Sequence, residues 1–294
     1  MKVCVRAIPS TLSKGIQRVA LALERYAPEG VTIVQEPKDA DLWVLHVIGH
    51  GSMEEVPQYQ GKIAMVQYCL LTTEDSRPEA WLPYWQRAEA VWSYYDLIQY
   101  AFDRGTPLPV DVNFYHAPLG VDSSVFQPSV PVRKRFVIGT SGYVADTECA
   151  GECAQAAFAA ERMVFHLGPN LNLGKNAVYA KDLSDEDVAE FWSQCSYVAG
   201  LRRIEGFELP VLEGLACGAR PICFDAPHYR QWFGEHAEYI QEGSKEDVTA
   251  QLTDIFRGLV RVVTPAERDE VVRNFNWSRL AGGFWDRILA GGAR

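Results

Sequence analysis

An alternation of short apolar runs with amphipathic helical patterns, present twice along the 294 residues, constrains the fold more than any other feature of the sequence. In the first half the runs and helical patterns occupy residues 1–7, 15–27, 31–34, 41–49, 62–71 and 78–103, the last range containing a helix, a short strand and a helix. Strands that alternate with helices form mostly parallel sheets covered on both faces. The sequence therefore predicts an α/β fold.

A segment rich in proline and aspartate, residues 106–135, interrupts the alternation before it starts again. The second set of strands and helices falls at residues 135–143, 150–161, 163–169, 185–195, 196–200, 209–217 and 219–225, followed by further helices. A single hydrophobic core seldom organises a chain of this length. We therefore predict two domains in series, residues 1–127 and 128–294.

Charge and cysteine content narrow the class of protein. A net charge of −10 argues against a broad nucleic-acid surface, which needs clustered Lys and Arg. No secretory leader and no apolar run of about 18 residues is evident, so we expect a cytoplasmic protein without stable membrane insertion. The seven cysteines are scattered and odd in number, which indicates reduced thiols. Cys149 and Cys153 lack further ligands nearby, and no metal site is predicted.

Ligands of open parallel sheets bind beyond the carboxyl ends of the strands, and a cleft between two such domains is the expected site. Small or polar residues follow several of the predicted strands. They are Gly15 at the start of the first helix, His50, the run Thr140, Ser141 and Gly142, and the loop GLRRIEGFELP from Gly200 to Pro210.

The stretch EGFELPVLE holds two acids on either side of a helix start. Pro210 suits the first turn of a helix, which places Glu205 in the preceding loop and Glu213 on the helix itself. A helix N-terminus favours phosphate, and a carboxylate can accept from two neighbouring sugar hydroxyls. This combination fits a nucleotide-sugar, although Glu213 could instead complement the helix dipole and Glu205 could be a solvated acid.

The longer run EGFELPVLEGLACGARPICFD resembles the signature of GT-B glycosyltransferases of the family 4 type, in which seven residues separate two acids. Three further segments resemble the same family in the same order: SKGIQRVALAL, HAPLGVDSSVFQP and FNWSRLAGGFWDRIL. The resemblance implies two Rossmann-like domains facing a cleft, with the last helix crossing back to the first domain. It also implies an acceptor side in the first domain and a donor domain in the second.

The resemblance assigns roles to individual residues. Glu205 would contact the hydroxyls of the donor sugar near the reacting carbon, and Glu213 would hold the ribose hydroxyls. The loop from Gly206 would bring the backbone N–H groups of Phe207, Glu208 and Leu209 to the sugar and diphosphate. The family transfers the sugar with retention and without a metal or other cofactor.

Two departures from the family pattern concern the charges and the histidine. The strand end of the second domain, IGTSGYVADTECAGECAQ, lacks the usual Arg and Lys for the diphosphate. Arg202 and Arg203 are the candidates to replace them, with Lys175 and Lys181 as others, unless the two arginines are a solvated pair. In the first domain Gln67 of AMVQYCLL stands near the position of the family's histidine, and His50 is the second candidate for that catalytic role.

We therefore predict a glycosyltransferase that moves a sugar, with a UDP-sugar favoured as donor, to a hydroxyl acceptor. Seven aromatic residues of the first domain have helical spacing, which is typical of a core but also of a stacking platform: Trp81, Tyr84, Trp85, Trp92, Tyr94, Tyr95 and Tyr100. An exposed platform would admit a hydroxylated base of phage-type DNA as the acceptor, with a saccharide or small molecule as other choices. The missing cations leave a second alternative, a non-catalytic module that binds nucleotide-sugars or a partner.

Overall fold

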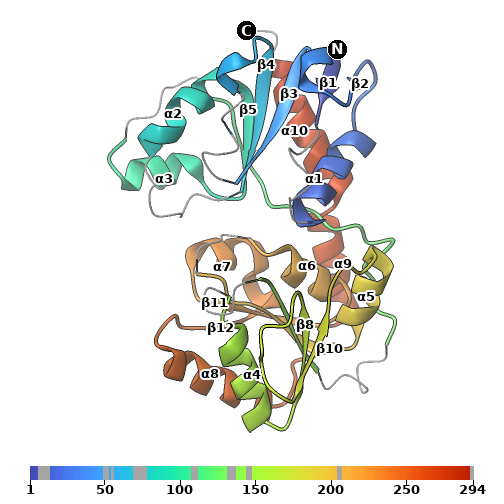
Figure 1. The fold of residues 1–294 in the computed structure, drawn as a ribbon, viewed down its shortest axis with the longest axis vertical. Coiled ribbons are helices and arrows are strands. Elements are labelled where there is room, and N and C mark those ends of the chain that lie inside the picture. Colours follow the sequence, from blue (N-terminus) through green and yellow to red (C-terminus); the bar gives the residue numbers. More distant parts are fainter. Residues whose placement is uncertain are drawn as a thin grey trace. The chain divides into compact units, whose positions relative to one another are not determined.

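A computed structural model describes residues 1–5, 14–48, 53, 56–68, 78–106, 112–130, 137–143, 148–203 and 207–291. The chain divides into two compact units. The first takes in the residues up to Gly120 and the segment from Trp277 onward, and the second takes in the residues from Val121 to Asn276 that lie on either side of the 204–206 segment. Each unit contains a six-stranded sheet whose strands all run parallel (Figure 1).

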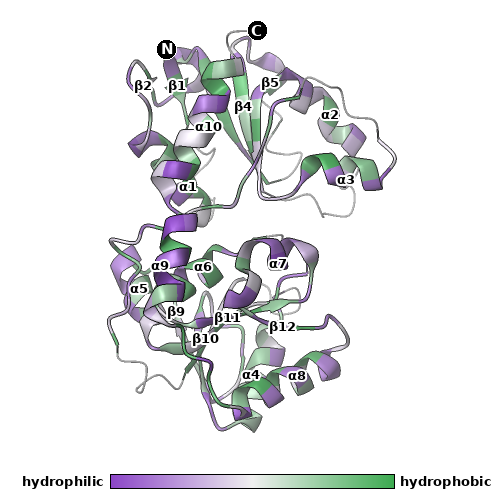
Figure 2. Ribbon diagram, turned by 180° about the vertical axis from the view of Figure 1, so that it is seen from behind, coloured by the Kyte–Doolittle hydropathy of each residue, from purple (hydrophilic) through white to green (hydrophobic). Residues whose placement is uncertain are grey.

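The sheet of the first unit has the strand order β2-β1-β3-β4-β5-β6. Its strands are β1 (Lys2–Cys4), β2 (Thr32–Ile33), β3 (Leu42–Val47), β4 (Lys62–Gln67), β5 (Ala88–Ser93) and β6 (Phe114–His116). The helices of this unit are α1 (Lys14–Arg25), α2 (Pro78–Arg87), α3 (Leu97–Asp103) and α10 (Trp277–Gly291). The central strands are almost entirely buried, as continuous apolar runs in a parallel sheet require, and Figure 2 shows their hydrophobic character on β4.

Helix α10 completes the first unit although it comes from the far end of the sequence. It contacts β5, β6 and α1. The buried indole of Trp285 donates to the carbonyl oxygen of Leu23 at 3.1 Å, and Phe284 packs against Trp92 with ring centroids 5.4 Å apart. The predicted return of the last helix to the first domain is therefore confirmed.

The second unit has the strand order β12-β11-β10-β7-β8-β9. Its strands are β7 (Val137–Ser141), β8 (Met163–Leu167), β9 (Ala177–Ala180), β10 (Cys195–Gly200), β11 (Arg220–Phe224) and β12 (Glu238–Ile240). Its helices are α4 (Ala150–Ala159), α5 (Asp185–Ser193), α6 (Leu209–Ala216), α7 (Pro227–Phe233), α8 (Lys245–Arg257) and α9 (Pro265–Asn274). The predicted α/β class with two parallel sheets is confirmed.

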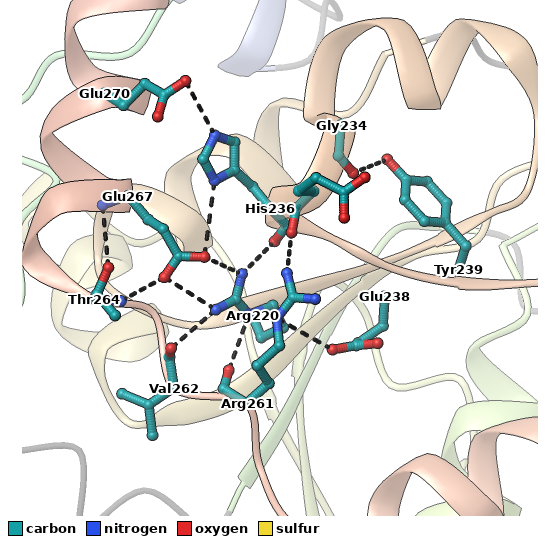
Figure 3. A network of polar contacts seen from close by, with 11 residues as sticks. Arg220, Gly234, His236, Glu238, Tyr239, Arg261, Val262, Thr264, Glu267 and Glu270 are labelled. Atoms are coloured by element: carbon teal, nitrogen blue, oxygen red, sulfur yellow. Dashed lines mark hydrogen bonds and ion pairs between the residues drawn. The ribbon is translucent and has the colours of Figure 1, made fainter.

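A buried arginine fastens the start of α9 to the amino end of β11 (Figure 3). Arg220 is 1% exposed and donates to four groups, the carbonyl oxygens of His236, Arg261 and Val262 and the carboxylate of Glu267. Burial raises the pKa of Glu267, but the hydrogen bonds from Arg220 and from Thr264 outweigh it and lower that pKa to about 2. Ligands of open parallel sheets bind beyond the carboxyl ends of the strands, and this network lies at the amino end of β11, so we assign it a structural role.

Most of the seven aromatic residues with helical spacing belong to the core of the first unit. Six of the seven are buried, namely Trp81, Trp85, Trp92, Tyr94, Tyr95 and Tyr100. The platform alternative is therefore wrong for these six side chains, because a stacking surface must be open to its ligand.

Two further expectations can be compared with the described residues. Their six cysteines are buried and free of disulfide bonds. None of their helices has the length and apolar character needed to cross a membrane.

Candidate functional site

Helix α6 carries the second acid of the EGFELPVLE stretch and packs closely on β10. Gly200 of β10 and Gly214 of α6 make this approach possible: a Cβ on Gly200 would lie 2.3 Å from Val211 Cγ2, and one on Gly214 would lie 2.5 Å from Val198 Cγ2. The helix begins at Leu209 with Pro210 in its first turn, and Gly218 follows its end with φ +87°. The helix start is the one predicted from Pro210, and a glycine in the left-handed region commonly follows the end of a helix.

Glu213 is a carboxylate held inside the second unit. It is 2% exposed, and the indole Nε1 of Trp192 on α5 donates to its Oε2 at 3.3 Å. A buried carboxylate needs hydrogen-bond donors to offset the loss of water. The burial and the hydrogen bond of Glu213 therefore fit a carboxylate with a defined orientation, not one that is exposed to solvent.

Glu208 stands at the N-cap of α6 but does not cap it. Its side chain makes no hydrogen bond to the first turn and instead meets Arg202, whose Nε lies 3.2 Å from Oε1. The Nη2 atom of the same guanidinium is 3.4 Å from Oε1 of Glu148. Two carboxylates thus hold one arginine at the carboxyl end of β10, where the sequence predicted a cation.

Arg203, the other predicted cation, belongs to a different set of contacts. Its Nη1 donates to Oε1 of Glu242 at 2.6 Å and its Nη2 donates to the carbonyl oxygen of Gly243 at 3.2 Å. The guanidinium also lies over the ring of Phe224, 5.4 Å from its centre. The structure thus separates the two arginines that are adjacent in sequence: within the described residues, the guanidinium of Arg202 meets Glu208 at the start of α6, whereas that of Arg203 meets Glu242 and Gly243.

A buried histidine organises the carboxyl end of β7. His166 on β8 is completely buried; its Nδ1 lies 2.9 Å from Oγ1 of Thr140 and its Nε2 lies 3.2 Å from the carbonyl oxygen of Gly142. A carbonyl only accepts, so Nε2 carries the proton and Nδ1 accepts from the threonine hydroxyl. Burial lowers the pKa of His166, partly opposed by its bond to Gly142, which keeps the imidazole neutral.

Glycine is required at the same strand end. Gly142 has φ +140°, and a Cβ there would lie 1.8 Å from Oε2 of Glu148. Gly168 after β8 has φ +156°, and a Cβ there would lie 2.1 Å from the carbonyl oxygen of Gly142. Because Glu148 also meets Arg202, the β7 strand end and the start of α6 share one polar cluster, which we call the Arg202 cluster: Arg202, Glu148 and Glu208.

Comparisons with known proteins identify the fold. No family model matches the sequence, and no curated protein matches it. Solved structures do match: HepE from Anabaena, in complex with UDP and glucose, has a TM-score of 0.73 at 11% identity over 99% of this chain and 100% of its own. AviGT4, a glycosyltransferase involved in avilamycin A biosynthesis, has a TM-score of 0.66 at 13% identity over 100% and 98%.

A longer protein of known structure gives the same result. The pneumococcal O-GlcNAc transferase GtfA, in complex with UDP and GlcNAc, has a TM-score of 0.68 at 13% identity over 96% of this chain and 61% of its own. Together these matches show that the chain of 294 residues has the GT-B glycosyltransferase fold. Identities this low show the fold alone, so the predicted resemblance to GT-B enzymes of the family 4 type is confirmed at that level.

Several other predicted site residues have the following positions in the structure. Gly15 is the second residue of α1. The Phe207 ring is 3% exposed and stacks on Phe233, with centroids 5.5 Å apart, so its side chain is part of the core. Leu209 is 8% exposed at the first position of α6. Glu205, Gly206 and His50 lie outside the described residues.

Gln67, predicted as a catalytic residue of the first domain, is the last residue of β4. It is completely buried, and its amide Oε1 accepts from the indole Nε1 of Trp85 at 3.3 Å. The described geometry therefore shows Gln67 as a hydrogen-bond partner within the core of the first unit.

Sequence reasoning missed His46, the first unit's counterpart of His166. Its Nε2 lies 2.9 Å from the carbonyl oxygen of Val5 just after β1, and its Nδ1 lies 2.7 Å from the hydroxyl of Tyr68. Burial lowers the pKa of His46 to about 4, partly opposed by the bond to Val5. The only signal in the sequence was a lone polar residue inside the apolar run of β3.

No group of three or more His, Cys, Asp or Glu side chains in the described part of the chain could hold a metal ion.

Proposed function

We propose that this protein is a retaining, metal-independent glycosyltransferase that moves a sugar from a nucleoside diphosphate sugar, with UDP-sugars favoured, to a hydroxyl acceptor. The observation that carries the proposal is the buried carboxylate of Glu213 on α6, in the second Rossmann-like unit of a GT-B fold. HepE and GtfA, which share the fold, were both solved with UDP. In this proposal Glu213 binds the ribose hydroxyls and Glu205 binds the hydroxyls of the donor sugar.

The first turn of α6 is the proposed site for the sugar and diphosphate. Backbone N–H groups of Phe207, Glu208 and Leu209 would meet them, because a helix N-terminus favours negative charge. Glu208 leaves this turn uncapped by its side chain, which supports the assignment. Catalysis would come from positioning and from stabilising the diphosphate as it leaves.

Arg202 is the proposed cation for the diphosphate. It lies at the carboxyl end of β10 in the Arg202 cluster, where two carboxylates fix its guanidinium. Thr140, Ser141 and Gly142 would bound the same site at the end of β7. Arg203, whose guanidinium is committed to Glu242 and Gly243, would contribute charge without direct contact.

One observation favours a second candidate, a module that binds a nucleotide-sugar without transferring it. The β7 strand and its end, Val137 to Tyr143, contain no Lys or Arg, and Arg202 already faces two acids. Such a module would bind the donor but leave its glycosidic bond intact. We propose no DNA acceptor, because the aromatic side chains that suggested one are mostly buried.

Turnover of a panel of UDP-, GDP- and ADP-sugars tests the proposal, with release of the nucleoside diphosphate as the readout. We expect release from one donor by the wild type, and its loss in Glu205→Gln and in Glu213→Ala. Glu190→Gln, which changes an exposed acid on α5 of the same unit, is the matched control and should keep the wild-type rate. Binding without release in the presence of an acceptor library would favour the binding module, and no binding of any donor would reject both.

A further inference from the structure

A buried indole is the partner of the acid proposed for the ribose. Trp192 is completely buried, and its Nε1 donates to Oε2 of Glu213 from the neighbouring helix α5. An indole N–H only donates, so this contact cannot reverse its direction. It therefore acts on the carboxylate in one way, by fixing where Oε2 lies.

Packing holds the Trp192 ring in place. A Cβ on Gly139 of β7 would lie 2.8 Å from its Cζ3 atom, so the ring occupies the space that a side chain at this position would need. Phe191 meets the same ring edge-on, with centroids 5.0 Å apart and planes at 75°. The indole therefore rests on a strand of the sheet and cannot move toward β7.

The terminal torsion of a glutamate side chain is intrinsically broad. A carboxylate that binds two neighbouring hydroxyls with its two oxygens needs a defined rotation about this bond, which a hydrogen bond from a fixed partner supplies. Trp192 and Glu213 are both buried, so water does not compete with this bond.

We propose that Trp192 is a positioning residue that orients the Glu213 carboxylate toward the 2′ and 3′ hydroxyls of the nucleotide ribose, and so makes the site prefer ribonucleotides. Gly139 belongs to the same device because it admits the indole against β7. This inference rests on the proposed function, which places the ribose at Glu213.

The test compares UDP, ADP and GDP with their 2′,3′-dideoxy forms, with affinity measured by calorimetry on the full chain. We expect the wild type to prefer the ribonucleotide, and Glu213→Ala to lose this preference. Trp192→Phe keeps an aromatic ring but removes the donor, so we expect the preference to fall about tenfold while the affinity for the dideoxy form stays unchanged. Gly139→Ala, which keeps the indole but displaces it, should lower the preference in the same way.

Trp285→Phe is the matched control, because it removes another buried indole donor, to the carbonyl oxygen of Leu23 in the first unit. It should leave the ribose preference at its wild-type value. Circular dichroism identifies any variant that fails to fold, and Gly139→Ala decides the question if Trp192→Phe does not fold.

The two hypotheses fail in different ways. A wild type without a ribose preference, or without nucleotide binding, rejects the proposed role of Glu213 and the inference with it. A preference that Glu213→Ala abolishes but Trp192→Phe and Gly139→Ala retain overturns the inference alone. Equal losses for the ribonucleotide and dideoxy forms would likewise overturn it, because they would show that the indole only packs.

Discussion

The two units end their first strands with the same hydrogen-bonding device. In each, a buried neutral histidine on an adjacent strand donates from Nε2 to a carbonyl oxygen at the strand's carboxyl end: His46 to Val5 in the first unit and His166 to Gly142 in the second. In each, Nδ1 accepts from a hydroxyl. The device satisfies a backbone carbonyl at the point where the sheet stops providing partners.

The units differ in where the hydroxyl comes from. Tyr68 follows β4, so the hydrogen bonds of His46 join three strands, whereas Thr140 lies on β7 itself and the hydrogen bonds of His166 join two. The second unit also has glycine on both strand ends, Gly142 and Gly168. The same bond thus serves mainly the core in the first unit, whereas in the second it lies at a strand end kept small by glycine, where we propose that the donor binds.

The largest effect is expected for His46→Leu, which should lower the free energy of unfolding by about 4 kcal/mol, because it takes a partner from two buried groups, the Val5 carbonyl and the Tyr68 hydroxyl. Urea unfolding followed by tryptophan fluorescence measures this. His166→Leu is the matched variant and should cost about 2 to 3 kcal/mol, since its hydroxyl and carbonyl partners both lie at the end of one strand, β7. Equal losses of stability in the two variants would mean that the number of strands joined by the hydrogen bonds of the histidine does not affect its contribution.

A pH series measures the contribution of neutral His46 to stability. His46 has its pKa lowered from 6.5 to about 4, so the unfolded chain takes up this proton first as the pH falls. The contribution is complete above the unfolded value and is lost between about pH 6.5 and about pH 4, by about 3 kcal/mol at most. We expect this slope in the unfolding free energy of the wild type and a flatter slope in His46→Leu; the same slope in both would contradict it.

The glycine at the second unit's strand end gives the next effect. Gly142→Ala places a Cβ against Glu148 at a positive φ and should cost about 2 kcal/mol. It should also weaken UDP binding, because Glu148 helps to hold Arg202. Gly151→Ala on α4 is the control: its Cβ meets nothing within 4 Å, and alanine is favoured in a helix, so stability should rise slightly. A stable Gly142→Ala would show that Glu148 moves without cost.

The smallest effect separates the two hydroxyls. Tyr68→Phe and Thr140→Val each delete one donor to a histidine Nδ1, and each should cost about 1 kcal/mol in urea unfolding. The losses should disappear in the background of the matching histidine variant, His46→Leu or His166→Leu. Losses that persist there would assign the energy to packing instead.

The central strands and helices of each unit could be predicted from the sequence, because the preferences of neighbouring residues determine them. The start of α6 with Pro210 in its first turn and the glycine after its end follow from backbone preferences that neighbouring residues determine. The strands that sequence reasoning missed, β6, β9 and β12, are all edge strands of three or four residues. Such short edge strands contain no long apolar run from which a strand could be predicted. The apolar run at residues 31–34 contains β2, which is likewise an edge strand, of two residues.

The two-acid motif of the candidate site could be predicted from the sequence, but the contacts that hold its residues in place could not. The spacing of the two acids is a local pattern, whereas the contact of Trp192 with Glu213 joins residues 21 positions apart, and that of Thr140 with His166 depends on the register of β7 and β8. No sequence period encodes such register. The choice between Arg202 and Arg203 also needed the fold, because only packing decides which of two adjacent side chains faces which loop.

The position of α10 has a consequence for biosynthesis. A ribosome makes the first unit's sheet early, then the whole second unit, and only afterwards the helix whose Trp285 bonds to Leu23. The nascent first unit therefore exposes the apolar faces of β5 and α1 while the second unit is already able to fold. The unit whose sheet is translated before the second unit is completed after it, and in that interval its uncovered apolar faces need protection from aggregation.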